Sequence, residues 1–281
     1  MRPIIVVDSA SDLGQTEGRD IQSLPLRVLL GDREGLDGVD ILPEDIYKYF
    51  EKTKKTPKTA AVEPARFQEL FEKLTSEGRE VIYVAVASTM SGCYNNARIA
   101  AEGMNGVYVI DSHWLSAGAA LLALYADDLA EEGLSAPEIV KKVEARRGDV
   151  KLSLILDTMT FLYKGGRCKA VAAFVAGVLK IKPAIIMQDE KLFVGKKYIG
   201  PANRSFMKYA NDMLKNAKID PKYFFLIHTS PSRELLDKVR QQIIDVCPDV
   251  NIIERVASAT VTSHCGKGGF ALIYLEPQKS E

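Results

Sequence analysis

The stretch Val81-Ile-Tyr-Val-Ala-Val-Ala87, followed by Ser88-Thr-Met-Ser-Gly-Cys-Tyr-Asn-Asn-Ala97, decides the fold. The first seven residues are apolar and mostly β-branched, which predicts a buried strand. The next residues carry three hydroxyls and a glycine, and they predict a loop that leads into a helix over 94–101. A strand that continues through a short loop into a helix is the repeating unit of a parallel sheet.

The same unit recurs in the first half of the chain. Apolar runs predict further strands at Ile4–Val7 and Val107–Ile110, and a long helix covers about Leu115–Glu132. Strands of this type with helices between them predict a mostly parallel sheet flanked by helices. We expect residues 1–149 to form this N-terminal α/β domain.

The second half has a different pattern. Two short apolar runs, Ala184–Met187 and Leu192–Val194, flank Asp189-Glu190-Lys191 and predict a hairpin. Helical patterns surround the hairpin, so we expect residues 150–281 to form a C-terminal α/β domain with a mixed sheet. The run Val171–Leu179 is apolar nearly all round, which predicts a buried helix.

The composition excludes several classes of protein. Of 281 residues, 47% are hydrophobic and 26% charged, and 37 Lys+Arg balance 37 Asp+Glu. A zero net charge argues against nucleic acid or an anionic membrane as the main partner. None of the four cysteines has C-x-x-C spacing, and no segment predicts a signal peptide or a membrane span. We expect a cytoplasmic protein without stable membrane insertion, metal or cofactor.

The loop Ser88–Gly92 is the first candidate site. It lies at the carboxyl end of a predicted parallel strand, where open sheets bind ligands. A helix that begins at about Gly92 would direct unpaired N–H groups and its positive dipole end toward an anion. The alternative is that Ser91 only caps this helix.

Acidic residues end two other predicted strands, in Asp8-Ser9 and Asp111-Ser112. Paired carboxylates could perform acid–base chemistry. Capping of helices and lining of a cleft is the interpretation that we favour.

Three histidines are present, His113, His228 and His264, and their spacing does not support a zinc site. His264 lies in Ser263-His-Cys-Gly-Lys-Gly-Gly269, which predicts a glycine-rich loop. Because functional residues are frequent on loops, His264 is the strongest single polar candidate.

Lys164-Gly-Gly-Arg167 places two cations around a flexible pair. It could hold a phosphate, or it could be a helix C-terminus, where cations suit the dipole. The chain lacks G-x-x-x-x-G-K-[ST], G-x-G-x-x-G after a strand, and G-x-S-x-G. Nucleotide binding and α/β-hydrolase chemistry therefore lose support.

Seven segments in order over nearly the whole chain resemble the DegV family of bacterial fatty-acid-binding proteins. They are Asp8-Ser-Ala-Ser-Asp-Leu13, Asp37-Gly-Val-Asp40 with Thr59, Ser91-Gly92, Val109-Ile-Asp-Ser112, Asp157-Thr158 with Leu162-Tyr-Lys-Gly-Gly-Arg167, Ile181-Lys-Pro183, and His264-Cys-Gly-Lys-Gly268.

The resemblance implies two α/β domains with a lipid tunnel and the binding of one long-chain fatty acid without catalysis. It assigns the carboxylate ligands to Thr59 and Ser91 at the helix that begins at Gly92, with His264 nearby. It also implies that some members present the bound acid to a fatty acid kinase, with Arg167 near the kinase-facing end.

The chain departs from the family pattern at several positions. It has Thr59-Ala-Ala-Val62 for Thr-Ser-Gln-Pro, Ser91-Gly-Cys-Tyr-Asn95 for Ser-Gly-Thr-Tyr-Gln, and Lys267 for a proline. The family's Lys-x-Arg-Gly after the hairpin is Lys197-Tyr-Ile-Gly200 here. The first two changes each remove a hydroxyl. Together, the four changes weaken the case for a fatty acid kinase as partner.

Most of the binding energy would come from the acyl tail. About fifteen methylenes at ~0.8 kcal/mol each give roughly 12 kcal/mol before the costs of ordering. Candidate lining segments are Leu121–Leu124 and Phe174–Leu179, with plain core as the alternative. Two other functions remain open: an enzyme with Ser91 as nucleophile and His264 as base, and a phosphoryl-sugar binder.

Overall fold

A computed structural model describes residues 2–14, 18–175 and 181–278. Its first sheet is fully parallel, with strand order β2-β1-β6-β7. The bounds of these strands are Ile4–Asp8 (β1), Ile21–Leu24 (β2), Val81–Ala85 (β6) and Val107–Asp111 (β7).

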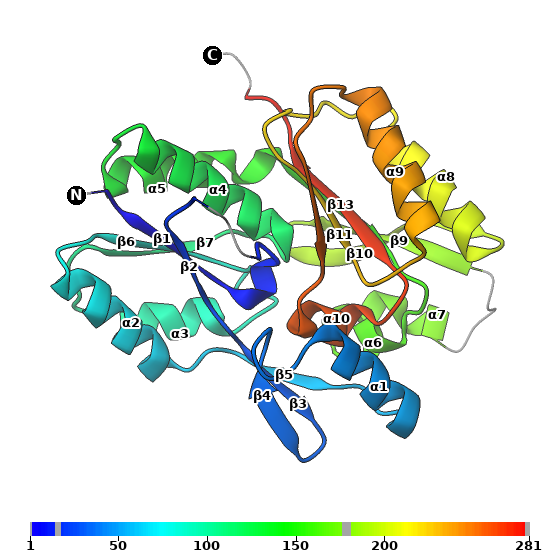
Figure 1. Cartoon of the computed structure of the whole chain (residues 1–281), viewed down its shortest axis with the longest axis horizontal. Coiled ribbons are helices and arrows are strands. Elements are labelled where there is room, and N and C mark those ends of the chain that lie inside the picture. Colours follow the sequence, from blue (N-terminus) through cyan, green and yellow to red (C-terminus); the bar gives the residue numbers. More distant parts are fainter. Residues whose placement is uncertain (1, 15–17, 176–180, 279–281) are drawn as a thin grey trace.

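Helices cover both faces of this sheet (Figure 1). They are Pro64–Ser76 (α2) and Cys93–Ala100 (α3) on one face, and Ala117–Glu131 (α4) and Ala136–Arg146 (α5) on the other. Side chains of a strand alternate between faces, so Ile4 and Val6 pack with α2 and α3, whereas Ile5 and Val7 pack with α4. The parallel sheet predicted for the first half is confirmed.

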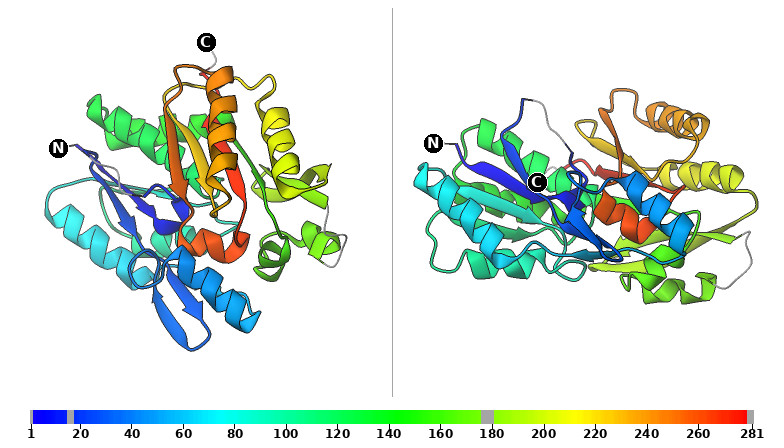
Figure 2. Two further views of the ribbon diagram at one scale, coloured as in Figure 1. Left: turned by 45° about the vertical axis from the view of Figure 1, so that its right-hand side comes forward. Right: turned by 60° about the horizontal axis from the view of Figure 1, so that its bottom comes forward.

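A small antiparallel sheet with order β4-β3-β5 was not predicted. Its strands are Arg27–Leu30 (β3), Arg33–Leu36 (β4) and Lys58–Ala60 (β5), and the helix Pro43–Thr53 (α1) leads from β4 toward β5. Figures 1 and 2 show α1 beside α10 (Ala259–Cys265), which comes from the other end of the chain. Phe50 of α1 packs on Phe161, with ring centroids 4.5 Å apart.

The largest sheet is mixed, with order β10-β9-β8-β13-β11-β12. Its strands are Val150–Ile155 (β8), Ile181–Gln188 (β9), Lys191–Ile199 (β10), Phe224–His228 (β11), Ile252–Val256 (β12) and Phe270–Leu275 (β13). Only β11 and β12 are parallel neighbours, and β9 and β10 form the predicted hairpin. Helices Ala202–Leu214 (α8) and Arg233–Val246 (α9) cover its outer face. The predicted mixed sheet, and with it the α/β fold class, is confirmed.

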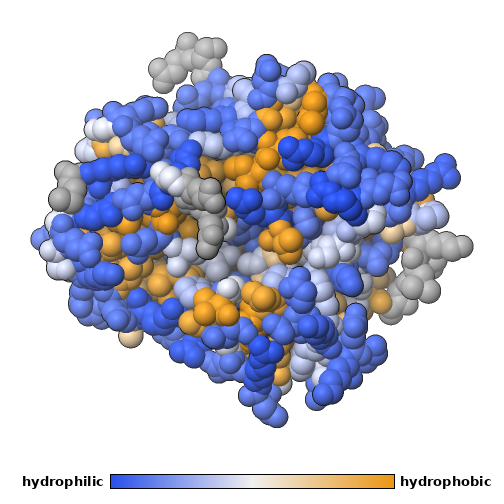
Figure 3. All heavy atoms as spheres, in the orientation of Figure 1, coloured by the Kyte–Doolittle hydropathy of each residue, from blue (hydrophilic) through white to orange (hydrophobic). Residues whose placement is uncertain are grey.

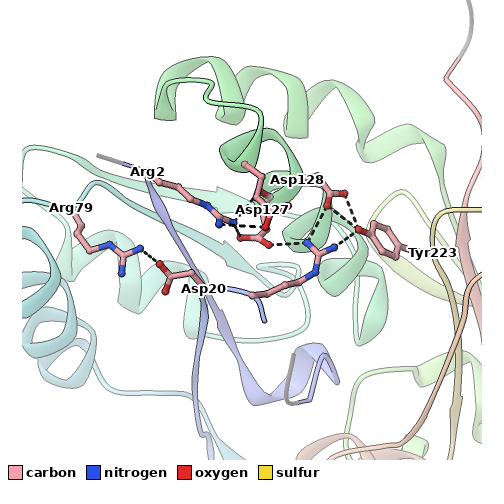
Figure 4. A network of polar contacts seen from close by, with 8 residues as sticks. Arg2, Asp20, Arg79, Asp127, Asp128 and Tyr223 are labelled. Atoms are coloured by element: carbon pink, nitrogen blue, oxygen red, sulfur yellow. Dashed lines mark hydrogen bonds and ion pairs between the residues drawn. The ribbon is translucent and has the colours of Figure 1, made fainter. Parts of the chain in front are cut away.

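The two large sheets share α4, which packs against β1 and β6 on one side and β8 and β13 on the other. A partly buried ionic network extends this contact (Figure 4). Arg19 binds Asp127 at 2.8 Å and Asp128 at 3.0 Å, and Tyr223 donates to Asp128 at 2.9 Å. The division of the chain into domains at 149/150 stays a prediction.

Two sequence-based expectations are wrong. His264 lies in the last turn of α10 and not in a loop, because the helix that Ser258 caps continues to Cys265. The segment after the short helix Thr160–Lys164 (α6) is not a buried helix. In Lys169–Val171 (η3) and Ala172–Val175 (α7), only Val171 is buried. Residues 176–179 of that prediction lie outside the described residues.

The surface shows no concentrated apolar face in the view of Figure 3, where apolar side chains form several separate patches among charged ones. Exposed apolar side chains include Val39, Ile99 and Ile199. In the described part of the chain, no helix combines the length and apolar character that crossing a membrane requires.

Candidate functional site

A cavity of about 110 Å³ lies where segments from both halves of the chain meet. Its wall is largely apolar and includes Leu26, Val86, Leu115, Leu154, Leu162 and Val261. Leu154 comes from β8, Leu162 from α6 and Val261 from α10, whereas the others lie in connecting segments next to β3, β6 and α4. Such a space suits an apolar ligand.

The five residues that the family resemblance indicated all line this one cavity. They are Thr59 of β5, Ser91 and Gly92 at the start of α3, Arg167 after α6, and His264 of α10. Segments separated by long stretches of chain therefore converge at one place. The role of each residue in binding a ligand stays a prediction.

Thr59 and His264 are directly linked, since Thr59 Oγ1 lies 3.1 Å from His264 Nε2. Burial, together with the positive charge of Arg167, lowers the pKa of His264 to about 3. The ring is therefore neutral at physiological pH. Its Nδ1 has no hydrogen-bond partner among the described residues.

The tautomer of His264 follows from this unpaired atom. A proton on Nδ1 would leave a buried donor without an acceptor, which is rarer and costlier than a bare acceptor. We therefore assign the proton to Nε2, which donates to Thr59 Oγ1. The hydroxyl hydrogen of Thr59 then remains available to a ligand.

Gly165 leaves room for the His264 ring because it has no side chain. A methyl group on Gly165 would lie 2.4 Å from His264 Nδ1 and 3.0 Å from the Phe161 carbonyl oxygen. The sequence indicated only a flexible pair between two cations. The glycine pair was the available signal, but its packing role requires knowledge that α6 and α10 touch.

The position of Ser91 is compatible with both alternatives predicted for it, a helix cap and a ligand-binding residue. Its Oγ accepts a hydrogen bond from Cys93 N at 3.3 Å, so it helps to cap α3, whose N-cap residue is Gly92. It also lines the cavity. Because a hydroxyl both donates and accepts, Ser91 can cap the helix and still donate its hydrogen to a ligand.

Arg167 brings a positive charge to the same wall. Its Nη1 donates to the Gly165 carbonyl at 2.8 Å and its Nε donates to the Met90 carbonyl at 3.3 Å. No carboxylate among the described residues forms an ion pair with it, and burial lowers the pKa of Arg167 below its usual value. A second, more open hollow of about 330 Å³ is lined by Ser88–Gly92 and Gly165–Arg167.

Buried carboxylates that the sequence analysis did not single out anchor α10. Asp37 accepts from Ala259 N at 2.8 Å and from Thr260 N at 3.2 Å. Asp12 accepts from Ser258 N at 2.7 Å and also from the Ser116 hydroxyl. Burial raises the pKa of Asp12 to about 7. Both residues belong to the motif segments noted above, which was the only available signal.

Asp8 caps the short helix Ser9–Ser11, as favoured, whereas Asp111 caps no described helix, and neither carboxylate lines the cavity of about 110 Å³. Asp8 accepts from Ala10 N at 3.0 Å and from the Tyr83 hydroxyl at 2.6 Å, and Asp111 accepts from His113 N at 3.1 Å.

Within residues 2–14, 18–175 and 181–278, one group of side chains could hold a metal ion: Asp111, His113 and Glu190. These side chains already have partners. His113 Nδ1 lies 3.3 Å from Glu190, and Asp111 accepts from the backbone N–H of His113.

The geometry does not support the serine-enzyme alternative. In the part of the chain that the structure describes, no hydrogen bond joins Ser91 to His264, whose Nε2 is engaged by Thr59. A histidine with a pKa of about 3 is also a poor general base at neutral pH.

Comparisons with known proteins find relatives that match nearly the whole chain. The DegV domain-containing protein TTE1491 of Caldanaerobacter subterraneus is 30% identical over 278 residues, which cover 97% of this chain and 98% of that protein. A DegV lipid binding protein from Thermotoga maritima has a similar crystal structure (TM-score 0.83, 26% identity, 99% of this chain and 100% of that chain).

The Streptococcus pneumoniae Fatty Acid Kinase (Fak) B3 protein, crystallised with linoleic acid, shares the fold. Its TM-score is 0.87 at 22% identity, with 99% of this chain and 100% of that chain covered. Residues 4–277 match the family model described as "Uncharacterised protein, DegV family". The match spans nearly the whole chain, which therefore belongs to the DegV family.

Proposed function

We propose that this protein binds one long-chain fatty acid, with the carboxylate held by Thr59 and Ser91 at the N-terminus of α3 and the tail in the apolar cavity. The observation that carries the proposal is the presence of both hydroxyls and Arg167 in the wall of one otherwise apolar cavity. The lipid binding described for the Thermotoga maritima relative supports it.

The polar groups match a carboxylate. Thr59 and Ser91 each offer a hydroxyl hydrogen, and α3 contributes the positive end of its dipole. Hydroxyls and a dipole alone would make an ionised head group costly to bury. Arg167 supplies the cation that the sequence analysis did not place there, and a charge-assisted hydrogen bond favours the ionised form.

The tail requires the cavity to expand. A dry cavity of about 150 Å³ holds a benzene-sized molecule, so about 110 Å³ is too small for a long acyl chain. Side chains must therefore move apart when the tail enters, which reduces the net affinity below the gross hydrophobic gain. Leu121–Leu124 do not line this cavity but belong to the buried core.

We also propose that the bound acid can be presented to a fatty acid kinase. The open hollow beside Ser88–Gly92 and Gly165–Arg167 offers a partner access to the head group from outside. Arg167 also lines that hollow, which suits its expected place at the kinase-facing end. In this scheme the chain itself acts as a carrier and performs no catalysis.

Identification of the bound lipid tests the main proposal. The purified protein would be denatured and extracted for mass spectrometry, and delipidated protein would be offered palmitate and oleate. We expect a co-purifying fatty acid and saturable binding of one equivalent. A protein that contains no lipid and takes up neither acid would overturn the proposal.

A double variant, Thr59→Ala with Ser91→Ala, tests the head-group site. We expect at least a tenfold weaker affinity for palmitate with an unchanged circular dichroism spectrum. Unchanged affinity would refute the assigned ligands. Labelling of Ser91 by a fluorophosphonate probe would instead favour a serine enzyme.

A further inference from the structure

Three segments that meet at the cavity carry an excess of exposed positive charge. Residues 43–60, 157–175 and 259–268 contain nine lysine and arginine residues against four acids, although the whole chain has no net charge. All nine cations are exposed, and none of them forms an ion pair with another described residue. Two of the four acids, Asp45 and Asp157, are already paired with cations. The unpaired charge in these segments is therefore mostly positive.

The three segments lie side by side in the fold. The rings of Phe50 and Phe161, with centroids 4.5 Å apart, join α1 to α6, and Lys267 Nζ lies 5.5 Å from the centre of the Tyr47 ring. Helix α10 touches α1, α6 and β5, and Figures 1 and 2 show the three helices beside one another. The exposed cations therefore belong to one region of the surface.

Four of the exposed lysines lie within four positions of a cavity residue in the chain. They are Lys55 and Lys58 before Thr59, Lys169 after Arg167, and Lys267 after His264. None of the four lines the cavity itself, so they are not direct partners of a bound ligand. Cations around a cleft instead raise the local concentration of anions, and they speed association by about 10- to 1,000-fold.

We propose that the exposed cations around the cavity steer the ionised head group of a fatty acid toward it, and that they set the association rate without changing the dissociation rate. The inference rests on the proposed function and adds how the ligand is captured from solution. Exposed charges are screened over about 8 Å at physiological ionic strength, so the effect should be largest at low salt. It is also shared among many cations, so a single substitution should change the rate less than about twofold.

Stopped-flow fluorescence with cis-parinaric acid, a fluorescent fatty acid, measures both rate constants on delipidated protein. We expect the association rate constant of the wild type to fall about tenfold between about 20 and about 300 mM NaCl, with little change in the dissociation rate constant. The corresponding alcohol carries no charge, so its association should be independent of salt. The acid and the alcohol share one tail, which separates steering from tail binding.

A fourfold variant removes the cations closest to the cavity residues in the chain: Lys55→Gln, Lys58→Gln, Lys169→Gln and Lys267→Gln. Its matched control removes the same charge from exposed lysines of α5 and of the segment after α8: Lys141→Gln, Lys142→Gln, Lys215→Gln and Lys218→Gln. At low salt we expect the first variant to bind the acid about fivefold more slowly than the wild type. The control should stay within about twofold of the wild type, because its cations lie away from the cavity.

Three results would overturn the inference: association of the acid that does not depend on salt, equal slowing in both fourfold variants, or a change confined to the dissociation rate. Melting temperatures check that the variants are folded. If the loss of Lys267 from the Tyr47 ring lowers the melting temperature, the triple variant that retains Lys267 provides the same test. If the acid binds without these effects, only steering fails. If the wild type binds neither parinaric acid nor palmitate, the proposed function fails.

Discussion

Thr59 Oγ1 lies 3.1 Å from His264 Nε2, although 205 positions separate the two residues in the chain. The contact joins the three-residue strand β5 to the last turn of α10. Because the ring is neutral and donates from Nε2, it orients the Thr59 hydroxyl so that its hydrogen is directed away from the ring. The pair is therefore a preformed donor for an acidic head group.

The first prediction concerns this hydroxyl. Thr59→Val keeps the shape of the side chain and removes the donor, so the affinity for palmitate should fall about tenfold, the equivalent of ~1.4 kcal/mol. Titration calorimetry measures the change. Thr75→Val is the matched control, because Thr75 bonds only the backbone of α2, and it should leave the affinity unchanged. Equal affinities for Thr59→Val and the wild type would exclude the assigned donor.

Gly165→Ala should displace His264. The added methyl would lie 2.4 Å from Nδ1, so the ring must move and its contact with Thr59 should be lost. We expect a several-fold loss of palmitate affinity and a shifted imidazole resonance in the NMR spectrum. Gly148→Ala is the control, since no heavy atom lies within 4 Å of a methyl placed there. A normal imidazole resonance in Gly165→Ala would show that the ring tolerates the methyl.

Arg167→Gln should separate charge recognition from tail binding. Arg167 has no acidic partner in the described residues, so its charge can act on the carboxylate of the ligand. We expect a tenfold or greater loss of affinity for oleate and little change for oleyl alcohol, which has no charge. Lys164→Gln, which removes a neighbouring exposed cation, serves as the control. An equal loss for oleate and the alcohol would indicate a packing role instead.

Continuous apolar runs predicted much of this fold, whereas segments without such a run did not. The strands β1, β6 and β7 and the β9–β10 hairpin follow from local pattern. In contrast, Lys58-Thr-Ala60 contains almost no apolar signal, and its pairing with β3 depends on a partner about thirty positions away in the chain. Thr59 is therefore placed by a strand that no local pattern could reveal.

Local sequence already indicated Ser91 and His264 as candidate site residues, whereas Thr59 was indicated only by the family resemblance. Physical reasoning from local sequence placed His264 in a loop because of its glycines, whereas a distant carboxylate, Asp37, caps the helix that carries it.

Asp37→Asn should lower global stability through α10. The two oxygens of Asp37 accept the N–H groups of Ala259 and Thr260, and an amide nitrogen cannot replace one of them. We expect the free energy of unfolding in urea to fall by about 1–2 kcal/mol. Asp245→Asn, at an exposed site bonded only to Gln241, should have no measurable effect. Equal stability of the Asp37 and Asp245 variants would contradict the capping role.

Asp12→Asn should change how stability depends on pH. Burial raises the pKa of Asp12 from 3.8 to about 7, so the folded state holds a proton that the unfolded state releases between these values. The contribution of Asp12 to stability is therefore fully present below about pH 4 and is lost as the pH rises through 7. The neighbouring Asp37 strengthens this effect, whereas hydrogen bonds from Ser116 and Ser258 oppose it.

An asparagine at this position stays neutral at every pH. The stability of Asp12→Asn relative to the wild type should therefore increase between pH 4 and pH 8, by as much as a few kcal/mol. Urea unfolding at several pH values measures both proteins under the same conditions. Asp8, whose pKa burial also raises to about 6, is present in both and its effect largely cancels in the difference. A difference that stays constant over this range would mean that Asp12 is ionised in the folded protein at low pH.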